Sequence, residues 1–189
     1  MAKSIENFVM QGASGKVGKM LVFRQRAEQT IIAKRPKKNN KPATEAQLEF
    51  RDRFTEAALY AKSAISNPAL KEEYQAKAKL GQSAYNVAFA DYLKAPELRR
   101  VMADEYSGQI DDTVAFRIID NFKLQSVNVR ILDENNAVIE QGAAVPLDNG
   151  IDWQYTATVA NPTVLGTNLE VTAKDTPGNV VTFNNIISS

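Results

Sequence analysis

The spacing of apolar residues changes near the middle of the chain, and this change constrains the fold more than any other feature. Between residues 44 and 94, apolar side chains recur every three or four positions, as at Phe50, Phe54, Ala57 and Ala61. This spacing predicts amphipathic helices. From about Ser107, apolar and polar residues alternate in stretches such as SVNVRIL and NLEVTAK, which predicts strands. The sequence therefore predicts an α+β fold.

Helix-capping residues divide the middle of the chain into three predicted helices. Thr44 and Gln47 form a capping box that opens a helix to about residue 66. Asn67 and Pro68 start a second helix, which we expect to run to about residue 80. The third helix is predicted over residues 83–94, and PELRRVM, residues 96–102, is predicted to form a short helical turn.

The last 80 or so residues are typical of a small antiparallel β-sandwich. Turn sequences such as DENN, DNG and DTPGN separate five to seven short alternating stretches. We expect an Ig-like sandwich, in architecture only, because the chain has no cysteine pair. The predicted domains are residues 1–106, an N-terminal β-hairpin with a helical domain, and residues 107–189, the Ig-like sandwich.

Two short strands around a turn near residues 27–28 form the predicted N-terminal hairpin. The first strand is expected over residues 17–24 and the second over residues 29–35, followed by the linker PKKNNKP. The preceding stretch GASGKVGK resembles a phosphate-binding loop only superficially. Five residues separate Gly12 from Gly18, and Met20 follows Lys19 where a P-loop needs a hydroxyl. We interpret these glycines as flexible entry into a strand.

Composition argues against catalysis, because the chain contains neither histidine nor cysteine. It therefore lacks the commonest general base and the usual zinc ligands, and we expect no enzyme activity, no cofactor and no small-molecule substrate. Two minor alternatives stay open. The turn Asp133–Asn136 is a candidate calcium site, and Trp153 is either sandwich core or a carbohydrate-stacking surface.

The sequence contains no obvious targeting or membrane-spanning segment. Its first residues lack the apolar core of a signal peptide, and no apolar run approaches the length of a transmembrane helix. The expected location stays open between the cytoplasm, a virion and export by a non-classical route.

Positive charge is concentrated at the front of the chain. Residues 1–60 hold twelve Lys or Arg against six Asp or Glu, whereas residues 116–189 hold four against eight. The candidate cations for a polyanion or an acidic partner are Lys16, Lys19, Arg24, Arg26, Lys34, Arg35, Lys37 and Lys38. A basic β-ribbon of this kind binds nucleic acid, protects an aggregation-prone edge, or adds its strands to another subunit.

The front half of the chain resembles a family of uncharacterised proteins from Bacteroidetes and bacteriophage genomes. The resemblance rests on a GKVG start, a strand pair that ends in a basic residue and proline, and the pattern T-x-A-Q. SAYNVAFADYLKAPEL and the later W-x-Y stretch extend it over most of the chain. The resemblance implies a shared fold with a C-terminal Ig-like sandwich and transfers no activity.

These observations predict a non-enzymatic structural protein that self-assembles into a filament, tube or particle. N-terminal strands would pair between subunits, and the chain itself would be the main partner. The expected subunit-interface residues are Val17, Leu21, Phe23, Ile31 and Ile32. The alternative is a nucleic-acid-binding protein that uses residues 16–41.

Overall fold

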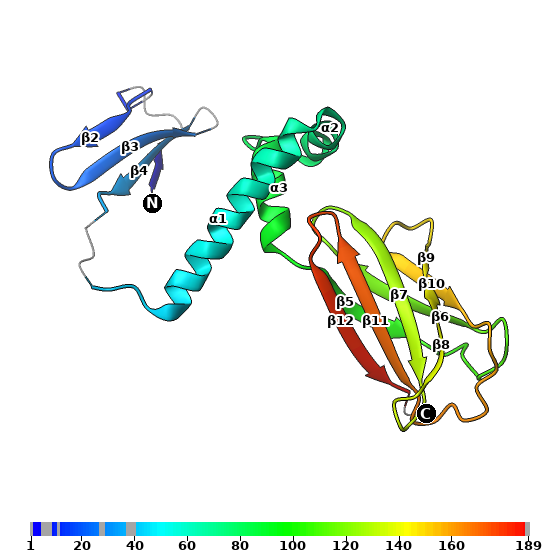
Figure 1. Ribbon diagram of the computed structural model, residues 1–189. Helices are drawn as coiled ribbons and strands as arrows, with labels where there is room; N and C mark the ends of the chain where they lie inside the picture. The colour runs from blue at the N-terminus through cyan, green and yellow to red at the C-terminus, as the bar shows by residue number, and fades with distance from the viewer. Residues whose placement is uncertain (1, 5–8, 11, 27–28, 37–40, 188–189) are drawn as a thin grey trace.

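The computed structural model describes residues 2–4, 9–10, 12–26, 29–36 and 41–187. Figure 1 shows three groups of elements along the chain: a small N-terminal sheet, three helices, and two further sheets. The fold is α+β, with antiparallel pairing in every sheet. The N-terminal sheet lies at one end of the molecule and the C-terminal sheets lie at the other (Figure 1).

The N-terminal sheet contains four strands in the order β1-β4-β3-β2. Their bounds are β1 (Ala2–Ser4), β2 (Gly15–Val17), β3 (Leu21–Arg26) and β4 (Gln29–Lys34). The expected single strand over residues 17–24 is wrong, because Gly18 has a φ of 58° and turns the chain between β2 and β3. This conformation favours glycine, and it explains one glycine of the GASGKVGK stretch.

Three helices follow: α1 (Glu45–Ser66), α2 (Pro68–Lys77) and α3 (Ala84–Leu93). The predicted caps are confirmed. Thr44 and Gln47 form a complete capping box, and the Asn67 side chain accepts from the first backbone N–H groups of α2. The second helix ends at Lys77, three residues before the expected end. Within the described part of the chain, no helix is long and apolar enough to cross a membrane.

The helices pack around a small core to which α1 contributes only its second half. Ala61 and Ala64 of α1 lie against Tyr74 of α2 and Ala88 of α3, all of them buried. Every residue of α1 from Glu45 to Glu56 is exposed. The first three turns of α1 therefore extend beyond the body that the helices form.

The remaining eight strands make two four-stranded sheets, ordered β5-β6-β10-β9 and β12-β11-β7-β8. Their bounds are β5 (Glu97–Met102), β6 (Thr113–Ile119), β7 (Leu124–Leu132), β8 (Val138–Ala143), β9 (Val145–Pro146), β10 (Asp152–Thr156), β11 (Asn168–Asp175) and β12 (Val180–Ile186). The helical turn predicted at residues 96–102 is wrong, because β5 pairs with β6. This pairing crosses the predicted boundary at residue 106 and outweighs the helix-forming composition of the segment.

The two C-terminal sheets lie face to face over one hydrophobic core. The predicted alternation is confirmed in β7, where Val127, Val129 and Ile131 are fully buried. Phe116 of β6 and Val171 of β11 join the same core from opposite sheets. Burial of a side chain of this size contributes about 1.5–3 kcal/mol to folding, so this core stabilises the C-terminal sheets without help from the N-terminal sheet.

Candidate assembly interface

The register of the N-terminal sheet separates its side chains into two different faces. Side chains directly opposite one another in an antiparallel pair share a face, and successive residues alternate between faces. Val17 lies opposite Leu21, and Phe23 lies opposite Ile32. These four residues therefore share one face, which we call the apolar face.

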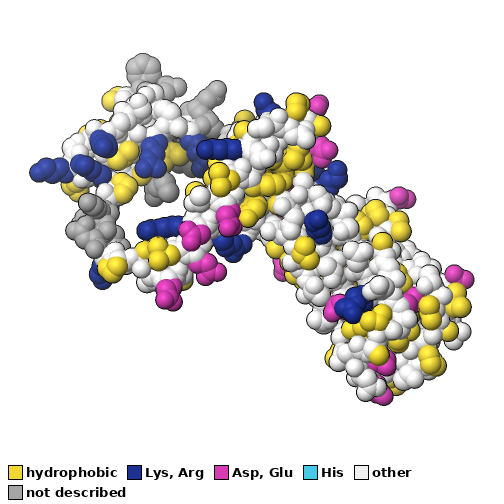
Figure 2. Space-filling model, in the orientation of Figure 1, with side chains coloured by type: hydrophobic (Ala, Val, Ile, Leu, Met, Phe, Trp, Pro, Cys, Tyr) yellow, Lys and Arg dark blue, Asp and Glu magenta, His cyan; other side chains and the backbone are white. Residues whose placement is uncertain are grey.

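The fifth expected interface residue, Ile31, lies on the other face, opposite Arg24. Arg26 follows two residues after Arg24, and Lys16 lies opposite Val22. Lys16, Arg24 and Arg26 are exposed, whereas Val22 and Ile31 are half-buried between them. This basic face combines an aliphatic floor with three cations, and Figure 2 shows Lys and Arg side chains gathered over the sheet.

The other predicted cations lie elsewhere. Lys34 lies on the apolar face opposite Leu21, Lys19 lies in the β2–β3 turn, and Arg35 follows β4. Together these three residues line one hollow with Met20. Lys37 and Lys38 lie outside the described residues.

The N-terminal sheet has little core of its own. Among its described residues, Phe23 is the one large hydrophobic side chain that is buried. Val17, Met20 and Leu21 are 54%, 70% and 40% exposed. A sheet is normally stable only when another layer covers its apolar side, and Val17 and Leu21 on the apolar face of this sheet are exposed.

An aromatic strip crosses the exposed part of α1 and the neighbouring surface of α3. The ring of Phe54 contacts the ring of Phe89 edge-on, with centroids 4.6 Å apart. Phe50 extends the row along α1 at 6.4 Å, and Tyr85 extends it along α3 at 6.1 Å. Phe50 and Phe54 are 61% and 49% exposed, although the sequence predicted that both would lie on the buried side of this helix. The row of apolar residues along α1 therefore extends beyond the core that the helices form.

An acidic stripe lies on the side of α1 that is turned away from Phe50 and Phe54. Glu45, Glu49, Asp52 and Glu56 are spaced by four, three and four residues, which places them on one side of a helix. All four are exposed. The Tyr92 hydroxyl of α3 donates to Glu56 Oε2 over 3.1 Å, so the stripe borders the α1–α3 contact.

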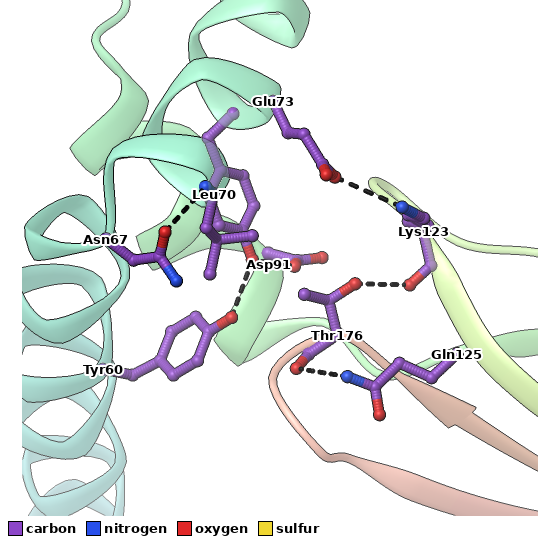
Figure 3. A network of polar contacts seen from close by, with 9 residues as sticks. Tyr60, Asn67, Leu70, Glu73, Asp91, Lys123, Gln125 and Thr176 are labelled. Carbon is purple, nitrogen blue, oxygen red and sulfur yellow. Dashed lines mark hydrogen bonds and ion pairs between the residues drawn. The ribbon is translucent and has the colours of Figure 1, made fainter.

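A buried carboxylate, which the sequence analysis missed, lies where the helices meet the C-terminal sheets. Asp91 of α3 has no exposed surface, and its Oδ2 accepts from the Tyr74 hydroxyl at 2.7 Å. The Tyr60 hydroxyl lies 2.8 Å from that of Tyr74; Figure 3 shows this contact region. Burial raises the pKa of Asp91 to about 7, while the bond from Tyr74 opposes the rise and the nearby Asp120 and Asp175 add to it.

Direct contacts join the helices to the C-terminal sheets around this carboxylate. The rings of Tyr74 and Phe122 stack with centroids 4.0 Å apart. Lys123 Nζ lies 3.3 Å from a carboxylate oxygen of Glu73 (Figure 3), and Asn179 donates to the Tyr92 carbonyl at 3.2 Å. These contacts join the helices to the C-terminal sheets. The backbone pairs of the N-terminal sheet, in contrast, all lie within residues 2–34.

The two minor candidates have structural roles in the fold. The backbone N–H groups of Asn135 and Ala137 each donate to Asp133 Oδ1 at 2.8 Å, so this carboxylate closes the β7–β8 turn. Within the described residues, no group of three or more acidic side chains could hold a metal ion. Trp153 is half-buried and packs against the core between the sheets.

No family model matches the chain. No curated protein matches it either. Among solved structures, it is similar to CopC from Methylosinus trichosporium OB3b, with 14% sequence identity, a TM-score of 0.37, and coverage of 48% of this chain and 88% of CopC. It is also similar to an engineered protein, with 14% identity and a TM-score of 0.36 over 59% of this chain and 30% of that one. TM-scores this low assign neither a fold nor a function.

Proposed function

We propose that this protein is a non-enzymatic structural subunit that self-assembles into a filament, tube or particle through its N-terminal sheet. The observation that carries the proposal concerns the described residues of this sheet and its turns, where Phe23 is buried and Val17, Met20 and Leu21 are exposed. Backbone pairing leaves β1 and β2 at the edges of that sheet. A neighbouring subunit would cover the exposed side chains and extend an edge.

The proposal includes an Ig-like architecture for the C-terminal sheets. Their strand orders, β5-β6-β10-β9 and β12-β11-β7-β8, correspond to the ABED and GFC arrangement with one added edge strand. In the assembled state this unit would be displayed on the surface or would contact the next copy.

A truncation that removes residues 1–35 tests self-assembly. The helices and the C-terminal sheets have cores of their own, so we expect the truncated chain to stay folded. Electron microscopy and sedimentation should show ordered polymers for the full chain and monomers for the truncated one, without nucleic acid and also at high salt. A full chain that stays monomeric at every concentration would reject the proposal.

Nucleic-acid binding is the second candidate, and the hollow lined by Lys19, Lys34 and Arg35 favours it. Three phosphate contacts would lower the affinity for duplex DNA by about 40-fold between 50 and 200 mM salt. Fluorescence anisotropy with labelled DNA measures this slope. Monomers that bind DNA with such a slope and form no polymers would replace the first proposal with this one.

A further inference from the structure

We propose that β12 is an open docking edge that pairs antiparallel with β12 of a second copy of this chain. The pairing would join two C-terminal sheets into one continuous sheet across a two-fold axis. This inference goes beyond the proposed N-terminal contact and does not depend on it. Figure 1 shows β12 at the outer edge of its sheet, and among the described residues β11 is the strand that pairs with it.

The other three edges of the C-terminal sheets carry features that block pairing. The register of β5 shifts at Arg99, and both Arg99 and Arg100 are exposed. The register of β8 is also irregular, and its buried Glu140 accepts from the Tyr155 hydroxyl. β9 has two residues and ends in Pro146. Bulges, charges on the edge, inward-pointing charges, prolines and short strands are the features with which proteins protect a sheet edge.

β12 carries none of these features. Its seven residues, VVTFNNI, include no charged residue, proline or glycine, and its register with β11 is regular over all seven pairs. Val180 and Ile186 at its two ends are 58% and 64% exposed. A long, uncharged and regular edge is a template for another strand, so β12 is the edge of these sheets that is suited to pairing.

The backbone groups of alternate residues in β12 point away from β11. At one end of the ladder the Ile187 N–H donates to the Thr167 carbonyl, and at the other end the Asp175 N–H donates to the Asn179 carbonyl. Bonded and non-bonded pairs alternate in an antiparallel ladder, so the odd-numbered residues of β12 bond to β11. The N–H and C=O groups of four residues therefore face the free edge: Val180, Thr182, Asn184 and Ile186.

One antiparallel register pairs all four of these residues in both copies. With Phe183 opposite Phe183 of the second copy, Val180 lies opposite Ile186, and Thr182 lies opposite Asn184. Each of these pairs exchanges two backbone bonds, so the contact contains about eight. Moving either strand by two residues leaves one outward residue of each strand unpaired. The backbone of β12 therefore favours a two-fold pair, in which the same surface of both copies meets.

The side chains of β12 fit the same register. The exposed apolar side chains of Val180 and Ile186 would cover one another, and the polar Thr182 and Asn184 would meet near the axis. Like charges directly opposite one another destabilise a strand pair, and β12 has no charge. A standard interface uses about 20–30 residues a side, so this seven-residue contact would be weak and reversible.

Hydrogen exchange of β12 in the full chain tests the pairing. The four outward N–H groups should exchange at least about tenfold more slowly in concentrated than in dilute protein. Asn184→Pro removes one outward N–H and places the proline ring at the free edge, without removing a bond to β11. It should abolish the concentration dependence for the other outward N–H groups. Asn184→Ala is the matched control, because it keeps the N–H and should behave like the natural chain.

Cysteine cross-linking tests the register, because the natural chain has no cysteine. One preparation carries Thr182→Cys, and a second carries Asn184→Cys. After mixing and brief oxidation, mass spectrometry should find the 182–184 link at more than its random share over the 182–182 and 184–184 links. Each chain carries a single cysteine, so every such link joins two copies.

The outcomes separate this inference from the proposed function. Exchange of β12 that is the same at every protein concentration would overturn the pairing. Protection of β12 without an excess of the 182–184 link would also overturn it, because another strand or another register would then occupy the edge. A full chain that forms no polymers but gives the 182–184 link would reject the proposed function and leave this pairing standing.

Discussion

Asp91 shows how a single residue can set the pH response of the fold. Its carboxyl group is fully buried on α3, accepts from the Tyr74 hydroxyl, and has Asp120 and Asp175 nearby. Burial also raises the pKa of Asp175. Both carboxyls therefore hold protons in the folded state at pH values where the unfolded chain has lost them.

Replacing Asp91 by Asn should flatten the pH dependence of stability. An unfolded Asp titrates near pH 3.9, whereas folded Asp91 titrates at about 7, so the folded state binds more protons between these values. The free energy of unfolding therefore falls as pH rises from about 4 to about 7. We expect Asp91→Asn to remove on the order of 2 kcal/mol of this fall, measured by urea unfolding at pH 4.5 and pH 8.

The control for this prediction is Asp133→Asn, in the β7–β8 turn. Its carboxylate accepts two backbone N–H groups at the surface of the C-terminal sheets. It should change the free energy of unfolding without reducing the fall between pH 4.5 and pH 8. An equally steep fall in Asp91→Asn would contradict the assignment of this pH response to Asp91.

Val17 on the apolar face should be needed for self-assembly. Val17→Asp places a charge on a side chain that the proposed neighbour would bury, and burying an unpaired charge is strongly unfavourable. We expect sedimentation velocity to show a loss of polymers at concentrations where the natural chain assembles. Val145→Asp on β9 is the matched control, because Val145 is 65% exposed and lies outside the N-terminal sheet. Equal effects of the two changes would argue against a specific role of the apolar face.

At the scale of elements, the sequence predicted what local chemistry determines. Thr44, Gln47 and Asn67 mark helix starts because their side chains satisfy backbone N–H groups close in sequence. The alternation in SVNVRIL predicted which side of β7 is buried. The sequence did not predict β5, whose conformation depends on pairing with β6, nor the two faces of the N-terminal sheet, which depend on the turn at Gly18. Asp91 was missed because a lone carboxyl on a helix gives no sign of burial.

The capping box at Thr44 should stabilise the first turns of α1, where every residue is exposed. The Thr44 hydroxyl accepts from the Gln47 N–H, and the Gln47 side chain accepts from the Thr44 N–H. Thr44→Ala should destabilise the first turns by about 1 kcal/mol and speed hydrogen exchange there roughly fivefold. Exchange near residue 60 should stay unchanged.

Thr55→Ala provides the control on the same helix. The Thr55 hydroxyl donates to the Arg51 carbonyl, within a helix whose backbone bonds remain. We expect little change in exchange for the first turns. Faster exchange in this variant as well would show that the whole exposed half of α1 frays regardless of its cap.

At the scale of the whole molecule, the chain divides into one joined body and one separate sheet. Tyr74, Phe122, Asn179 and the Glu73–Lys123 pair connect the helices to the C-terminal sheets. The strands of the N-terminal sheet pair with one another and with no strand of the C-terminal sheets among the described residues. This division is compatible with the proposed self-assembly, in which the N-terminal sheet would pair with a neighbouring subunit.

Removing the Phe122 ring should uncouple the helices from the C-terminal sheets. The ring stacks on Tyr74 and packs against the helical core. Phe122→Ala should therefore lower the free energy of unfolding by about 1–3 kcal/mol, which is less than the loss expected for a fully buried ring. Because each unit keeps its own core, calorimetry should show one transition splitting into two, with the helices unfolding first. Phe50→Ala, which removes an exposed ring, should leave the natural transition of dilute protein intact. A single transition that only shifts to lower temperature in Phe122→Ala would mean that the junction has enough other contacts to keep the body cooperative.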